Sequence, residues 1–144
     1  MSKLTLAQAE KIIASAFARG AELSLKPLTV AVLDAGGHLV ALSRQDGSSI
    51  LRPQVASGKA FGAVAVGAGS RWLDDNAKTR PHFVQALNGA AGGAIVPVPG
   101  GVLIREAKGG EILGAVGISG DTSDNDEACA IAGIEAIGLT PDQG

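Results

Sequence analysis

The sequence contains no tyrosine, and its phenylalanine and tryptophan residues together make up only 3% of the 144 positions. Glycine is abundant instead, with 21 residues, well above its usual share of roughly 7%. Small side chains bury little apolar surface, and burial contributes only about 25 cal/mol per Å². We therefore expect contacts between subunits to complete the core, and we predict a homo-oligomer.

The sequence also lacks an excess of basic residues, because 12 Lys and Arg residues stand against 14 Asp and Glu residues. A nucleic-acid-binding surface normally combines clustered cations with aromatic stacking platforms. Neither feature is present, so we expect no nucleic-acid partner.

Cysteine occurs once, as Cys129. A single cysteine excludes an intrachain disulfide framework, a cysteine-rich zinc site and the c-type haem attachment motif. We interpret Cys129 as a packing residue of the last helix rather than as a nucleophile.

No long apolar run is present, since charged residues interrupt the first 25 positions and glycines interrupt the small-residue tract over 60–68. This pattern predicts neither a signal peptide nor a membrane-spanning helix. We expect a cytoplasmic protein without membrane contact, and the length fits one domain over 1–144.

The order of apolar patterns predicts an α+β fold. Thr5 and Gln8 form a capping-box signature ahead of a helix that ends near Gly20. Two β-branched runs around a glycine turn, over 29–33 and 39–44, predict a hairpin. The rest of the chain predicts a helix over 53–68, helical pieces over 72–77 and 81–87, strands over 94–97, 101–105 and 111–119, and a helix capped by Asp124 and closed by Gly138.

The helix over 53–68 is crowded with glycine and alanine. Each glycine in a helix interior costs about 1 kcal/mol relative to alanine, so the composition needs a reason. We interpret it as close packing on the sheet or on another subunit, with a ligand lying on the helix as the alternative.

Several separated motifs resemble those of the GlcG/HbpS family, which includes the C-terminal domain of PduO-type proteins. The motifs are Val30–Val40, Arg44–Gly47, Lys59–Ala60, Ile112–Gly120 and Asp124–Gly133. The resemblance implies a profilin-like sandwich with about five antiparallel strands flanked by helices, assembled as dimers or larger rings. It also implies haem as a cofactor, because some members bind haem, and no other cofactor is expected.

The chain departs from the family pattern at two places. The segment over 71–88 is idiosyncratic, and Gln45 stands where many relatives have methionine. The second departure removes one soft axial ligand for haem iron.

The polar cluster that says most about function comprises Arg44, Asp46, Arg52 and Lys59. A helix N-terminus beside these cations predicts a site for a carboxylate, a phosphate or a haem propionate. The alternative is a salt bridge from Asp46 to Lys59 or Arg44 that only fixes the loop.

Two glycine-rich connections are further candidates for anion binding through backbone N–H groups. Their predicted ligand-binding residues are Gly100, Gly101, Ser119 and Gly120. Ordinary strand turns are the alternative. The adjacent Asp121 is a candidate acid or base, together with Asp124.

The two histidines are candidate axial ligands for haem. His38 lies in the predicted hairpin turn, and His82 follows Pro81. Imidazole is a common ligand of haem iron, although isolated surface histidines are the alternative. Because aromatic side chains are scarce, we expect a shallow or interfacial haem site.

Two main hypotheses of function follow. The first is an oligomer that binds haem or another carboxylate-bearing small molecule near Arg44, Lys59 and the glycine-rich loops. The second is a cofactor-independent isomerase, tautomerase or hydratase acting on a small oxo acid in catabolism. In this hypothesis Arg44 and Lys59 fix and polarise the substrate, while Asp46, Asp121 or His82 moves the proton. A purely structural assembly module is a third hypothesis, and whether the chain is an enzyme stays open.

Overall fold

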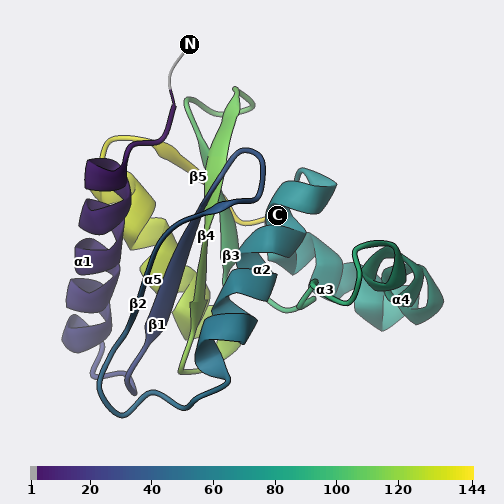
Figure 1. Ribbon diagram of the computed structural model, residues 1–144, viewed down its shortest axis with the longest axis horizontal. Helices are drawn as coiled ribbons and strands as arrows, with labels where there is room; N and C mark the ends of the chain where they lie inside the picture. The colour runs from purple at the N-terminus through teal and green to yellow at the C-terminus, as the bar shows by residue number, and fades with distance from the viewer. Residues whose placement is uncertain (1–2) are drawn as a thin grey trace.

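The computed structural model describes residues 3–144, which form a five-stranded sheet with five helices (Figure 1). The strands run in the order β2-β1-β4-β3-β5, and all neighbours are antiparallel. This arrangement confirms the predicted α+β class with five antiparallel strands. The elements are α1 (Leu6–Glu22), β1 (Thr29–Asp34), β2 (Leu39–Arg44), α2 (Arg52–Val66), α3 (Ser70–Thr79), α4 (Pro81–Ala90), β3 (Gly101–Arg105), β4 (Ile112–Ser119), α5 (Ser123–Ala136) and β5 (Thr140–Asp142).

Helices cover both faces of the sheet. The helices α1 and α5 lie on one face and α2 on the other, while α3 and α4 extend outward beyond α2 (Figure 1). The predicted capping box at Thr5 and Gln8 is confirmed, because each side chain bonds the backbone N–H of the other. No helix among residues 3–144 is long and apolar enough to cross a bilayer.

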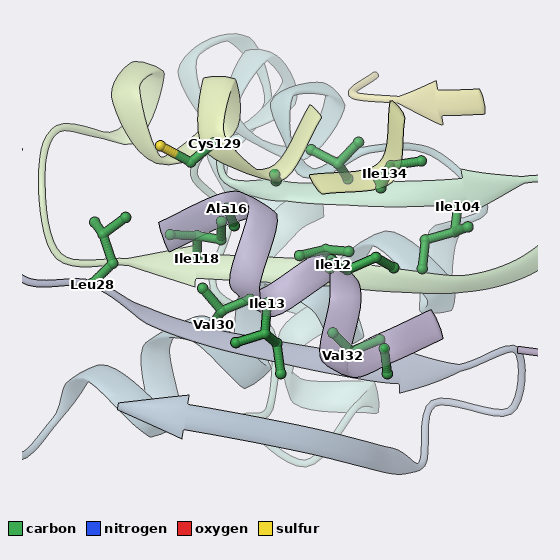
Figure 2. Close-up of a cluster of buried hydrophobic side chains, with 14 of the residues drawn as sticks. Ile12, Ile13, Ala16, Leu28, Val30, Val32, Ile104, Ile118, Cys129 and Ile134 are labelled. Carbon is green, nitrogen blue, oxygen red and sulfur yellow. The ribbon is translucent and has the colours of Figure 1, made fainter. Parts of the chain in front are cut away.

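The larger core lies between the sheet and the pair α1 and α5. Figure 2 shows aliphatic side chains of α1, β1, β3, β4 and α5 meeting there. The thiol of Cys129 is buried among them, which confirms its interpretation as a packing residue. Burial raises the pKa of this thiol to about 11, so it stays protonated at neutral pH.

On the opposite face, α2 approaches the sheet closely at strand positions that carry glycine. A Cβ at Gly117 of β4 would collide with the carbonyl oxygen of Ala56, and one at Gly101 of β3 would collide with the carbonyl oxygen of Lys59. The glycines of α2 itself face other segments, since a Cβ at Gly58 would lie 2.5 Å from Val96 and one at Gly62 would lie 2.9 Å from Leu73. The predicted packing of these helix glycines on the sheet is therefore wrong.

Two local predictions are wrong. The segment over 94–97 is not a strand, because it packs along α2, where the N–H of Val96 donates to the carbonyl of Gly58. The fifth strand is instead β5, which pairs with β3. Thr122, rather than Asp124, caps α5 by accepting a bond from the N–H of Asn125.

Candidate functional site

A buried ion pair ties α2 to α5 and to the end of β4. Lys59 Nζ donates to Asp126 Oδ2 at 3.0 Å and to the carbonyl of Ile118 at 2.9 Å. The two side chains are only 3% and 1% exposed. Burial lowers the pKa of Lys59 and raises that of Asp126, and the opposite charge of each partner counteracts the effect. The pair is therefore enclosed within the fold.

Several predicted ligand-binding residues gather around this pair. The Arg52 guanidinium donates to Ser119 Oγ at 2.9 Å, and the N–H of Gly101 donates to Ser70 Oγ at 2.8 Å. Gly100 has a φ of 122°, and a Cβ there would lie 2.9 Å from Lys59 Nζ.

The structure thus brings together five predicted residues from α2, β3 and β4. They are Arg52, Lys59, Gly100, Gly101 and Ser119. Buried Gly120 follows directly in the chain. Lys59 and Arg52 are occupied by groups of the protein itself, so ligand binding by the cluster stays a prediction.

Arg44 and Asp46 do not join this cluster. Both line a separate hollow near the end of α1, beside Lys26. The predicted salt bridge from Asp46 to Lys59 or Arg44 is wrong, because Lys59 pairs with Asp126 and neither Arg44 nor Asp46 forms an ion pair within residues 3–144.

Asp121 is held by three hydrogen bonds. The carboxylate accepts from the side chain of Asn125 and from the backbone N–H groups of Lys26 and Thr122. These bonds lower its pKa to about 2, so the group is ionised at neutral pH. Its catalytic role stays a prediction.

An apolar groove of about 570 Å³ runs beside α2, between the β1–β2 hairpin and the segment over 93–96. Its apolar lining comprises Leu33, Leu39, Leu51, Val55, Phe61 and Val96. Leu39 and Leu51 at its edge are 59% and 62% exposed. This groove was not predicted from the sequence. The apolar pair Ile50–Leu51 directly after a polar loop could have indicated an exposed apolar surface.

His38 is not among the residues that line the groove, although its chain neighbours Gly37 and Leu39 are. Its side chain is 81% exposed and lies beside Gly36 and Asp34, which line a different hollow. Nδ1 of His38 lies 3.3 Å from Oδ1 of Asp34. The imidazole is therefore both accessible and close to a carboxylate.

His82 occupies a different environment. It lies exposed in the first turn of α4, which packs on α3. Like His38, it is not among the residues that line the groove. The structure therefore separates the two predicted axial ligands.

Gln45 has a structural role. Its Oε1 accepts a hydrogen bond of 2.7 Å from the N–H of Leu28. The residue that replaces the methionine of many relatives thus links the loop after β2 to the start of β1.

Comparison with known proteins identifies similar chains of closely matching length. An uncharacterised 15.0 kDa protein from the dhaT–dhaS intergenic region of Citrobacter freundii is 25% identical over 139 residues, which cover 95% of this chain and 94% of that protein. The crystal structure of a PduOC–heme complex matches with a TM-score of 0.84 and 25% identity, covering 96% of this chain and 97% of that one. The crystal structure of HbpS matches with a TM-score of 0.80 and 27% identity, covering 96% and 92%. A family model described as "Haem degrading protein HbpS-like" matches residues 4–135, and the chain therefore belongs to the HbpS-like family.

Proposed function

We propose that this chain is a small-molecule-binding protein that holds haem, or another flat carboxylate-bearing molecule, in the groove beside α2. The observation that carries the proposal is the apolar groove itself, whose edge residues Leu39 and Leu51 are 59% and 62% exposed. The similarity to a protein crystallised as a heme complex supports haem as the first ligand to test.

The residues of the groove fit the apolar macrocycle of a haem. Leucine, valine and phenylalanine side chains suit such a surface. When bound, haem supplies a redox-active iron. No histidine is among the described residues that line the groove, so the fit is to the macrocycle and not to the iron.

Among residues 3–144, the lining of the groove offers no cationic partner for the propionates of a haem. The lining residues that the structure describes include no lysine or arginine, so the apolar body of the ligand determines the fit. This agrees with the shallow or interfacial site expected from the scarcity of aromatic residues.

A second copy of the chain would cover the open side of the groove. Leu39, Leu51 and the neighbouring Ile50 are 59%, 62% and 86% exposed. Large exposed apolar side chains that lie together are typical of interaction surfaces. We therefore retain the homo-oligomer with an interfacial ligand as part of the proposal.

The geometry does not favour the enzymatic alternative. An isomerase, tautomerase or hydratase of the predicted kind would need Lys59 and a proton-moving group such as Asp46 or Asp121 around one substrate. Lys59 is enclosed with Asp126, and Asp46 lines a different hollow. The catalytic roles of these residues stay predictions.

Titration of the purified protein with haemin tests the proposal. We expect a saturable shift of the Soret band in the wild type, because transfer of the iron porphyrin from water to an apolar groove changes its absorption. His82→Ala, at a position outside the groove, serves as a control and should bind like the wild type. A titration without a saturable shift would contradict the proposal.

A further inference from the structure

The sheet has two edge strands, and only one of them is protected against pairing with another chain. Strand β5 has three residues, includes Pro141 and carries the ion pair between Asp142 and Arg105. Short length, proline and charge protect the edges of natural sheets. Strand β2 has six residues, no proline and one charge, Arg44 at its end, and its one neighbour within residues 3–144 is β1. The edge of β2 is therefore open to a further strand.

The backbone of β2 directs hydrogen-bonding groups outward at Leu42 and Arg44. The N–H of Gln45 donates to the carbonyl of Leu28, so the backbone groups of Gln45 face β1. Successive residues of an antiparallel strand alternate between its two sides. Ser43 therefore also faces β1, whereas the N–H and carbonyl groups of Leu42 and Arg44 face away from the sheet. The register shift of the β1–β2 ladder lies nearer the hairpin and leaves this end of the strand regular.

Apolar side chains line hollows on both sides of this edge, because α1 and α2 lie on opposite faces of the sheet (Figure 1). Ile13 and Phe17 of α1 line one hollow of about 470 Å³ together with residues 41–43. Leu51 lines the groove beside α2 together with Leu39, the first residue of β2. A strand added to β2 would lie between these two apolar surfaces, so the edge suits a strand that is apolar on both faces.

A second copy of β2 is a strand of this kind. Its residues 39–42 are all apolar, so it presents apolar side chains to both faces of the sheet. When β2 pairs with itself about a twofold axis, every contact is made twice by the same residues. The outward backbone groups of each copy then bond those of the other, and the hollows on both faces are covered.

The charges at the two ends of β2 favour the antiparallel orientation. Arg44 forms no ion pair within residues 3–144. Asp34 lies at the hairpin end, where the bond from the backbone N–H of His38 is the largest contribution that lowers the pKa of its carboxyl group. Antiparallel pairing brings Arg44 of each copy to the hairpin end of the other copy. Parallel pairing would instead place the two arginines side by side.

We propose that β2 pairs in antiparallel orientation with β2 of a second copy of the chain, so that two five-stranded sheets join into one continuous sheet across a twofold axis. The inference rests on the homo-oligomer retained in the proposed function, and it identifies the interface. It requires no ligand, so it is tested on the protein without haemin.

Amide hydrogen exchange measured by NMR identifies this interface directly. The N–H groups of Leu42 and Arg44 face solvent in an isolated copy and are hydrogen-bonded in the proposed dimer. The N–H groups of Ser43 and Gln45 face β1 in both cases and serve as the internal reference. We expect sedimentation to show a species of at least twice 14.3 kDa. In this species the amides of Leu42 and Arg44 should exchange as slowly as the reference amides.

Leu42→Pro tests the same bonds by removing a donor. Proline lacks the outward N–H, and an edge strand accepts proline where the N–H side faces solvent, so the ladder with β1 is retained. Leu42→Ala is the matched control, because alanine also replaces the leucine side chain but keeps the N–H. Two hydrogen bonds are lost per dimer, so the dimer Kd of Leu42→Pro should be roughly 10–100-fold higher than that of Leu42→Ala.

A monomeric wild type would overturn the inference. An oligomer in which the amides of Leu42 and Arg44 exchange rapidly would also overturn it, as would equal dimer affinities of the two variants, because the copies would then meet through another surface. The exchange measurement on the wild type does not depend on the folding of either variant. Absence of haemin binding would refute the proposed ligand and leave the expected dimer unchanged.

Discussion

Replacement of Lys59 by methionine should lower the free energy of unfolding by about 3–5 kcal/mol, the usual cost of breaking a buried ion pair from one side. Methionine matches the length of the lysine stem but leaves Asp126 without its cation, at 1% exposure. The carbonyl of Ile118 also loses its donor. Urea unfolding monitored by circular dichroism measures the loss.

The double variant Lys59→Met/Asp126→Asn distinguishes the cost of an unpaired buried charge from the cost of altered packing at position 59. The asparagine is neutral, and its oxygen can still accept the bond that Asp126 Oδ1 receives from the N–H of Asp121. We expect the second substitution to restore about 1–3 kcal/mol, because coupled residues in one network deviate from additivity by about that amount. If the two substitutions lowered the free energy of unfolding additively, or if Lys59→Met alone lowered it by less than about 1 kcal/mol, the ion pair would not stabilise the packing of α2 against α5.

Gly117→Ala should destabilise the protein by about 3 kcal/mol, at the upper end of the usual cost of overpacking. The new methyl group would collide with the carbonyl oxygen of Ala56 and would lie 2.8 Å from the backbone nitrogen of Ala60. Both atoms belong to the backbone of α2, so relief requires the whole helix to move away from β4. Thermal or urea unfolding checks the result.

Gly89→Ala is the control for this substitution. Gly89 lies in α4, and a Cβ there would meet nothing within 4 Å. Alanine is favoured over glycine in a helix by about 1 kcal/mol, so this variant should be as stable as the wild type or slightly more stable. Equal destabilisation by the two substitutions would contradict the close approach of α2 to the sheet.

The sequence predicted most elements because their signals are local. The capping box at Thr5, the β1–β2 hairpin and the glycine after α5 each depend on a few adjacent residues. The segment over 94–97 has the composition of a strand, but its partner is the carbonyl of Gly58 in α2. Strand β5 has three residues, one of them Pro141, and exists only because β3 offers a free edge. Pairings of this kind between distant segments cannot be predicted from adjacent residues.

The candidate site was predictable only in part for the same reason. The sequence motifs indicated Arg52, Lys59 and Ser119, which the structure does bring together. The partner of Lys59 was missed, although Asp126 precedes buried Cys129 and Ala130 by three and four positions and so shares their helix face. An acidic residue on a buried helix face is a signal for an ion pair.

The groove depends on three segments that are distant in sequence. The hairpin at Leu39, the start of α2 at Leu51 and the return segment at Val96 form its walls. The groove shows that an apolar site can form although aromatic residues are scarce. Phe61 is the one aromatic side chain in its lining among the residues described. The ligand would therefore contact mostly aliphatic side chains.

The central claim is that the ligand occupies the groove beside α2, and a pair of neighbouring substitutions tests it most directly. Leu51 lines the groove, whereas Ile50 does not, and both are highly exposed. Leu51→Asp and Ile50→Asp add the same charge one residue apart. Both positions are exposed, so folding should be retained.

Haemin titration of the two variants gives the decisive comparison. Leu51→Asp should weaken binding by tenfold or more, because a carboxylate replaces an apolar contact with the macrocycle, whereas Ile50→Asp should bind within about twofold of the wild type. Equal affinities for the two variants and the wild type would contradict the placement of the ligand in this groove.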